Sequence, residues 1–65
     1  MKFIFEAITE ALEEDLEAHI EALSWGQPET FEKYAEMCGL IHGLRRCIDT
    51  VKDVETMMNK QEDDN

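Results

Sequence analysis

Two stretches of the chain repeat apolar residues with the period of an α-helix. In residues 3–24 and again in 28–59, apolar residues recur at intervals of three and four, and strand-like alternation fits neither stretch. In the first stretch they fall within an arc of roughly 160° on a helical wheel. Its apolar members are Ile4, Phe5, Ile8, Leu12, Leu16, Ile20 and Leu23. In the second stretch only Glu55 interrupts the pattern, whose members are Tyr34, Met37, Ile41, Leu44, Ile48, Val51 and Met58.

One short segment between these stretches carries the signals of a turn. Within residues 24–28, Gly26 suits the end of a helix and Pro28 suits the first turn of the next one. The sequence therefore predicts a helix over about 3–24, a turn over 25–28 and a second helix over about 28–59. Helices joined by so short a turn run antiparallel and pack together. We expect an all-α antiparallel helical hairpin as one domain over 1–60, followed by a fraying acidic tail over 61–65.

The second helix carries more apolar surface than one neighbouring helix covers. Its apolar arc exceeds about 200°, whereas an ordinary surface helix shows a stripe nearer 100°. Gly39 and Gly43 lie one turn apart on this arc, and each costs the helix roughly 1 kcal/mol relative to alanine. Either another backbone approaches them closely, or they make room for a bulky side chain of the first helix. The residues expected to form a helix-packing or oligomer interface are Gly39, Leu40, Gly43, Cys47, Val54, Met57 and Met58.

The predicted second helix is also the longer one, by roughly 15 Å. Its C-terminal third, with Val51, Val54, Met57 and Met58, is expected to project beyond the hairpin without cover. Exposed apolar surface of this kind marks interaction sites. Homodimerisation into a four-helix bundle is the simplest way to cover it. Docking onto a larger protein is the alternative.

Composition supports a small protein that depends on its partners. The chain has 65 residues and a formal net charge of −10, from 16 acidic residues and 6 lysines and arginines. So short a chain buries a thin core. Cys38 and Cys47 would lie roughly 13 Å apart on one helix, too far for a disulfide, which favours a reducing compartment. No signal peptide or membrane span is expected, and the negative charge argues against direct binding of nucleic acid or anionic lipid.

Acidic residues line the first helix opposite its apolar arc. This acidic face consists of Glu6, Glu10, Glu13, Glu14, Glu17 and Glu21. Several of these pairs are four residues apart, and each like-charged pair costs the helix about 0.2–0.5 kcal/mol. The face either keeps the protein in solution or docks onto a basic partner. In the second case the chain would be an acidic inhibitor of a basic host protein, of the nucleic-acid-mimic or anti-defence type.

Few residues suggest chemistry. His19 lies within the apolar arc, and we expect it to be half-buried with Tyr34 or a carboxylate as its hydrogen-bond partner. Cys38 and His42 stand one turn apart, but a structural zinc site needs four ligands. A nucleophile–base pair and a glycine-rich phosphate loop are both missing from the sequence. We therefore expect no catalytic residues, metal or cofactor, and no enzyme activity. Arg45, beside Arg46, is expected to pair with an acidic residue of the first helix or of a second subunit.

The second helix contains a recognisable pattern. The run Tyr34-x-x-x-Cys38-Gly39-x-Ile41-x-Gly43-Leu44, followed by Ile48, resembles a pattern in short open reading frames of tailed bacteriophages. The resemblance covers about half of the chain. It implies a phage origin, a virion-associated or accessory role, and a place in the cytoplasm of a bacterial host or in the virion. It carries no catalytic residues. The partner would then be the chain itself or a larger phage or host protein.

Overall fold

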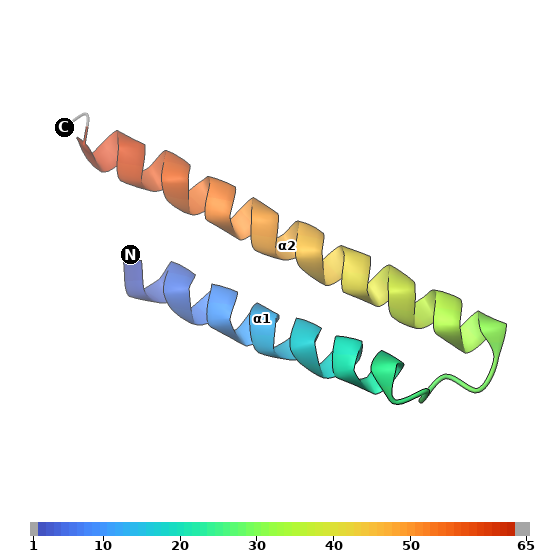
Figure 1. Ribbon diagram of the computed structural model, residues 1–65. Coiled ribbons are helices and arrows are strands. Elements are labelled where there is room, and N and C mark those ends of the chain that lie inside the picture. Colours follow the sequence, from blue (N-terminus) through green and yellow to red (C-terminus); the bar gives the residue numbers. More distant parts are fainter. Residues whose placement is uncertain (1, 64–65) are drawn as a thin grey trace.

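The protein is a hairpin of two antiparallel helices (Figure 1). The computed structural model describes the backbone of residues 2–63 and the exposure of residues 3–61. Helix α1 spans Lys2–Ser24 and helix α2 spans Phe31–Asp63. The molecule is elongated, with extents of 54 × 16 × 12 Å and a radius of gyration of 15.5 Å, where a compact domain of this length has about 11 Å. The predicted all-α helical hairpin is confirmed, and residues 64–65 of the predicted tail lie outside the described part.

Helix α1 ends at the predicted glycine. Gly26 has a φ of 75°, in the left-handed region that glycine adopts without a steric penalty. Its N–H donates to the carbonyl of Leu23 (3.1 Å), and the N–H of Gln27 donates to the carbonyl of Ala22 (3.2 Å). This pair of bonds is the Schellman motif, which satisfies carbonyls that the helix end would leave unpaired.

Helix α2 begins three residues later than the sequence pattern suggested. The connection covers residues 25–30, so the expectation that Pro28 opens the second helix is wrong. Thr30 caps the helix instead, because its Oγ1 accepts the N–H of Lys33 (3.1 Å) and its carbonyl accepts the N–H of Tyr34 (3.0 Å). At the other end α2 continues to Asp63, so residues predicted to fray form its last turn.

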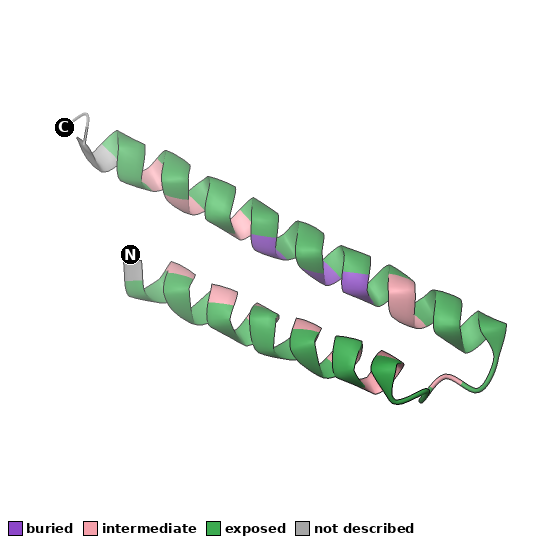
Figure 2. Cartoon of the chain, in the orientation of Figure 1, coloured by how far each residue is buried: buried purple, intermediate pink, exposed green. Residues whose placement is uncertain are grey.

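The two helices meet along a row of residues with coiled-coil spacing, which we call the contact seam. These residues are less exposed than their neighbours, and their numbers alternate by four and three (Figure 2). On α1 the contact seam comprises Phe5, Thr9, Leu12, Leu16, His19 and Leu23; on α2 it comprises Met37, Ile41, Leu44, Ile48, Val51, Glu55 and Met58. Among residues 3–61 only Ile41, Leu44 and Ile48 are buried. The core is therefore one layer thick.

The contact seam corrects two details of the prediction. Ile4, Ile8 and Ile20 belong to the apolar arc of α1 but lie beside the seam, with 57, 41 and 39% of their surface exposed. Val51 and Met58 are half-buried in the seam, because the first turns of α1 lie alongside the last turns of α2 (Figure 1). Helix α2 extends past α1 at both ends, with its last turns beyond the start of α1 and its first turns at the loop end of the hairpin (Figure 1).

Candidate interaction surface

An ion pair shows which residues of the two helices share a side of the hairpin. Lys52 Nζ of α2 lies 3.7 Å from Glu13 Oε1 of α1. Each of these residues follows a residue of the contact seam, Leu12 and Val51 respectively. Positions one after the seam on both helices therefore face the same side, which we call the ion-pair side. A shallow hollow of about 320 Å³ on this side is lined by Glu6, Thr9, Glu10, Glu13, Lys52 and Glu55.

Positions one before the seam share the opposite side for the same reason. In an antiparallel pair of right-handed helices, the residues that directly precede the seam on one helix lie on the same side of the pair as those that directly precede it on the other. We call this side the open face. It consists of Ile4, Ile8, Ala11, Asp15, Ala18 and Ala22 on α1, and Glu36, Leu40, Gly43, Cys47, Thr50, Val54 and Met57 on α2. All of these except Ala22 are exposed, and the charged residues among them are Asp15 and Glu36.

The open face gathers most of the residues that the sequence marked as an interface. Leu40, Gly43, Cys47, Val54 and Met57 lie together on it, and Gly39 lies at its outer edge on α2. Met58 does not, because it packs in the contact seam. The α1 half of the open face was not predicted. The sequence feature that could have predicted it is a row of alanines and isoleucines spaced by four and three. Each of these residues directly precedes a residue of the contact seam.

Side-chain size changes along the open face. The antiparallel arrangement and the Glu13–Lys52 pair place Ile4 and Ile8 at the same end as Val54 and Met57. The loop end of the face carries the small residues Ala18 and Ala22 on α1, and Leu40 and Gly43 on α2. The α1 half of the face is thus bulky at one end and low at the other.

The glycines of α2 face open space. A Cβ added to Gly39 or Gly43 would meet no heavy atom within 4 Å apart from the neighbouring backbone of the helix. The alternative that these glycines make room for a side chain of α1 is therefore wrong. Beside Gly43 runs an open groove of about 440 Å³, lined also by Arg46, Cys47, Thr50 and Val51.

The chain exposes more surface than a protein of its mass normally does. Its accessible surface is 5348 Å², compared with about 4,300 Å² for a folded monomer of 7.6 kDa. The difference of about 1,000 Å² exceeds the roughly 800 Å² that each partner contributes to a standard protein–protein interface.

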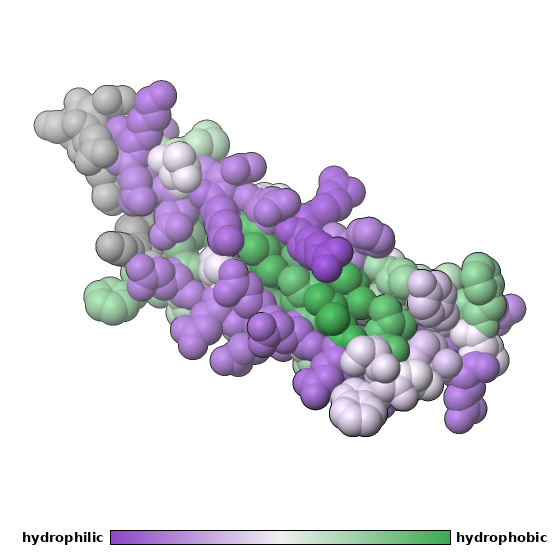
Figure 3. All heavy atoms as spheres, in the orientation of Figure 1, coloured by the Kyte–Doolittle hydropathy of each residue, from purple (hydrophilic) through white to green (hydrophobic). Residues whose placement is uncertain are grey.

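The structure divides the acidic face into two groups. All six of its glutamates are exposed. Glu6, Glu10, Glu13 and Glu17 follow seam residues and so belong to the ion-pair side, whereas Glu14 and Glu21 border the open face of α1. On the face drawn in Figure 3, hydrophilic side chains of both helices flank a hydrophobic band that follows the line where the helices meet.

His19 finds its hydrogen-bond partner within its own helix. Its Nδ1–H donates to the backbone carbonyl of Asp15 (2.7 Å) and lies 3.4 Å from Asp15 Oδ1. Tyr34, the other expected partner, instead forms a side-chain hydrogen bond with Cys38, which raises the pKa of Tyr34 above its ordinary value of 10.0. Both cysteines are free thiols.

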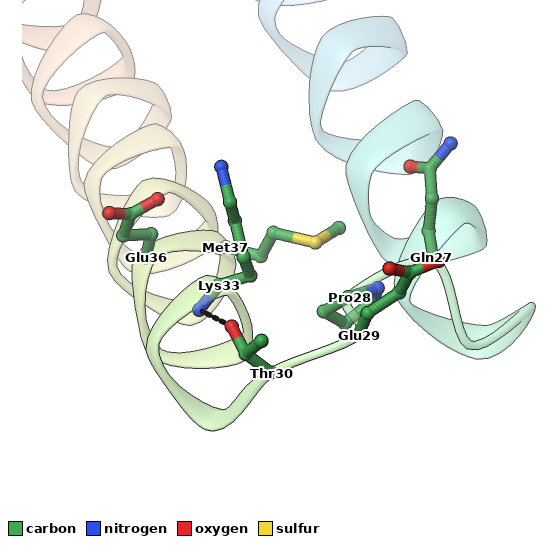
Figure 4. Close-up of a pocket in the computed structure, with 7 residues that line it drawn as sticks. All are labelled: Gln27, Pro28, Glu29, Thr30, Lys33, Glu36 and Met37. Atoms are coloured by element: carbon green, nitrogen blue, oxygen red, sulfur yellow. Dashed lines mark hydrogen bonds between the residues drawn. The ribbon is translucent and has the colours of Figure 1, made fainter.

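Two further features bear on possible chemistry: clusters of metal-ligating side chains and the hollow beside the loop. The described residues contain no group of three or more His, Cys, Asp or Glu side chains that could hold a metal ion. Between the loop and the first turns of α2 lies a hollow of about 340 Å³ (Figure 4). Its lining of Gln27, Pro28, Glu29, Thr30, Lys33, Glu36 and Met37 is exposed or half-buried, so the hollow holds no buried polar group. Arg45 forms no ion pair with any residue in the described range; Lys52 links the helices instead.

Comparisons with protein-family models, with curated proteins and with solved structures give no match to this chain. Neither helix in the described part of the chain is long and apolar enough to cross a membrane.

Proposed function

We propose that this chain is a non-enzymatic interaction protein whose open face packs against a helical surface of another protein molecule. The observation that carries the proposal is the open face itself, a second row of residues on each helix with the three–four spacing of a helix-packing seam. The contact seam is the surface through which the two helices pack on each other. A second apolar row on the same side of both helices indicates a further helical neighbour.

The surface area supports the same function. The whole chain exposes about 1,000 Å² more than a typical monomer of its mass, which is as much as one partner contributes to a specific protein–protein contact. The resemblance of residues 34–48 to a pattern in tailed-phage proteins extends the proposal to a structural or accessory protein of a bacteriophage. The acting residues on α2 would be Leu40, Gly43, Cys47, Val54 and Met57.

A photo-cross-linking experiment tests this function with a matched pair of positions. Ile8 and Ile20 are both isoleucines of α1 with nearly equal exposure, 41 and 39%. Ile8 lies on the open face and Ile20 on the ion-pair side. Each is replaced by benzoylphenylalanine in the full chain, and the cells that produce it are irradiated. We expect cross-linked protein from position 8 and little from position 20, whatever the mass of the partner.

A second function is favoured by the ion-pair side. Four exposed glutamates and Glu55 lie there with Lys52 as the ion-paired cation, which suits an acidic inhibitor that docks onto a basic host protein. Cross-linking from position 20 rather than position 8 would favour this function over the first. Replacing Glu6, Glu10 and Glu17 by lysine would then abolish binding while leaving the helices intact. Cross-links from neither position would contradict both functions.

A further inference from the structure

We propose that the neighbour on the open face is a second copy of this chain, joined through an antiparallel α2–α2 contact in which Arg46 pairs with the partner's Asp53. This inference rests on the proposed function and names its partner. A two-fold axis across the middle of the open face relates the two hairpins, so that Asp53 also pairs with the partner's Arg46. The product is a four-helix bundle.

The heptad positions of α2 provide the first argument. From Leu40 on, the α2 row of the open face alternates by three and four, as the apolar row of a coiled coil does: Leu40, Gly43, Cys47, Thr50, Val54 and Met57. Gly39, Arg46 and Asp53 directly precede Leu40, Cys47 and Val54. Lys60 follows Asp53 by seven residues and so occupies the same heptad position. These four residues are exposed and border the outer edge of the row. In an antiparallel pair of helices, this edge of one helix faces the same edge of the other.

Charge selects one register of the two copies. With Cys47 opposite the partner's Thr50, Arg46 faces the partner's Asp53 on both sides of the axis, and Lys60 faces the partner's Gly39. A shift of one heptad in one direction sets Asp53 against the partner's Asp53 and Arg46 against the partner's Lys60. The opposite shift sets Arg46 against the partner's Arg46. Like charges at such positions disfavour both shifted registers.

Side-chain volume agrees with the same register. Gly43 then lies opposite the partner's Val54, and Leu40 opposite the partner's Met57. The valine side chain enters the open groove of about 440 Å³ beside Gly43. Glycine at position 43 leaves this space free, since a Cβ there would point into open space in the single chain. On α1 the same axis sets the bulky end, with Ile4 and Ile8, over the partner's low end, with Ala18 and Ala22. Large side chains of each copy thus lie over small side chains of the other.

The charges on α1 oppose this association. Asp15 lies near the middle of the α1 row and Glu14 borders it, so the axis brings these two carboxylates towards their equivalents in the partner. The α2 contact, with its two reciprocal ion pairs and its apolar row, is therefore the part of the interface that stabilises the dimer.

Charge exchange tests the register in the full chain. Arg46 and Asp53 are seven residues apart on one helix, so they do not reach each other within a monomer. The variants are Arg46→Asp, Asp53→Arg and the double exchange, and Arg45→Asp is the matched control, since it makes the same charge change on the ion-pair side. Dimer dissociation constants are measured by sedimentation equilibrium at low salt, and circular dichroism checks the helices. We expect each single exchange to weaken the dimer at least about tenfold, because each converts two attractive pairs into like-charge pairs.

The double exchange decides the matter. It keeps the composition and net charge of the natural chain, and we expect it to return the dissociation constant to within about threefold of the natural value. The Arg45→Asp control stays within the same range. A double variant as weak as the single ones would overturn the register. A natural chain that stays monomeric at every concentration would overturn the second copy as partner, while a cross-link from position 8 to a larger protein would leave the proposed function standing.

Discussion

Glu13 and Lys52 form an ion pair between the two helices, with 3.7 Å between Oε1 and Nζ. Both side chains are about half exposed, 52 and 56%, and ion pairs of this kind contribute about 0–1 kcal/mol to the free energy of unfolding. The pair stabilises the hairpin little, but it marks the alignment of α1 with α2. It also lies on the side of the hairpin opposite the open face.

Core truncation should be costly only at the contact seam. Ile48 is 6% exposed and sits among the three buried residues of the core, so Ile48→Ala is expected to lower the free energy of unfolding by about 2–4 kcal/mol. Ile20→Ala is the control and should cost about 1 kcal/mol or less. Urea unfolding followed by circular dichroism measures both; if Ile48→Ala does not fold, Ile48→Val should still cost about 0.5–1.5 kcal/mol. Equal losses at positions 48 and 20 would contradict the single-layer core.

Alanine should act in opposite directions at two glycines. Gly26 has a left-handed backbone, so Gly26→Ala is expected to destabilise the hairpin by about 1–2 kcal/mol. Gly39 is helical and faces open space, so Gly39→Ala is expected to stabilise it by about 0.5–1 kcal/mol. Thermal unfolding of both variants beside the natural chain tests the pair. A destabilising Gly39→Ala would mean that a neighbour already needs this space.

Gly43 should separate the stability of the monomer from that of the dimer. In the series Gly43→Ala and Gly43→Leu, helix propensity rises by up to about 1 kcal/mol, since the added side chain meets nothing in its own chain. The dissociation constant of the dimer should rise as the side chain grows, by more than about tenfold for leucine. The added side chain would occupy the space beside position 43 that the proposed packing gives to the partner's Val54. Unfolding at high dilution and sedimentation equilibrium give the two quantities. A dimer tightened by Gly43→Leu would contradict the proposed packing.

Salt should strengthen self-association. Each chain carries a formal net charge of −10, so two copies repel each other, and carboxylates of α1 come together near the axis. Raising NaCl from about 0.05 M to about 1 M shortens the screening length several-fold and should lower the dissociation constant of the dimer. Complexes between the acidic face and a basic protein respond in the opposite sense. Light scattering after size exclusion at both salt concentrations distinguishes these two kinds of association.

Removal of one thiol should shift the titration of the single tyrosine. The side-chain hydrogen bond with Cys38 raises the pKa of Tyr34 above 10.0. A raised pKa favours the neutral phenol in the folded chain, so this contribution to stability is present below the unfolded pKa and is lost as the pH rises through the folded pKa. Cys38→Ala should therefore lower the titration midpoint measured by absorbance at the phenolate band, while Cys47→Ala, the control, should leave it unchanged. Equal midpoints in all three proteins would contradict the Tyr34–Cys38 bond.

Periodicity predicted α2 better than α1, for a physical reason. On α2 the seam residues Ile41, Leu44 and Ile48 are large and apolar, so the pattern identified the buried face directly. On α1 the seam includes Thr9 and His19, while Ile4 and Ile8 lie beside it. A helical wheel merges these two rows into one apolar arc. The two rows are distinguished only by where α2 packs against α1, and the periodicity of α1 does not specify that position.

The loop and the open face illustrate the same limit. Pro28 and Thr30 each offered a start for α2, and the hydrogen bond from the Lys33 N–H to Thr30 decided between them. The α2 half of the open face followed from an apolar arc too wide for one neighbour. Its α1 half remained hidden because alanine is common on any helix surface. Knowledge of which side the two helices share was needed to join the halves.

The thin core has a consequence for how long the protein persists. Only three side chains among residues 3–61 are buried, so a lone hairpin opens easily, and an open chain is what a protease cuts. Binding on the open face adds stability that grows with the concentration of the binding molecule. Copies in excess of their binding sites would then be degraded while bound copies survive. The abundance of the protein would adjust itself to that of the assembly it joins.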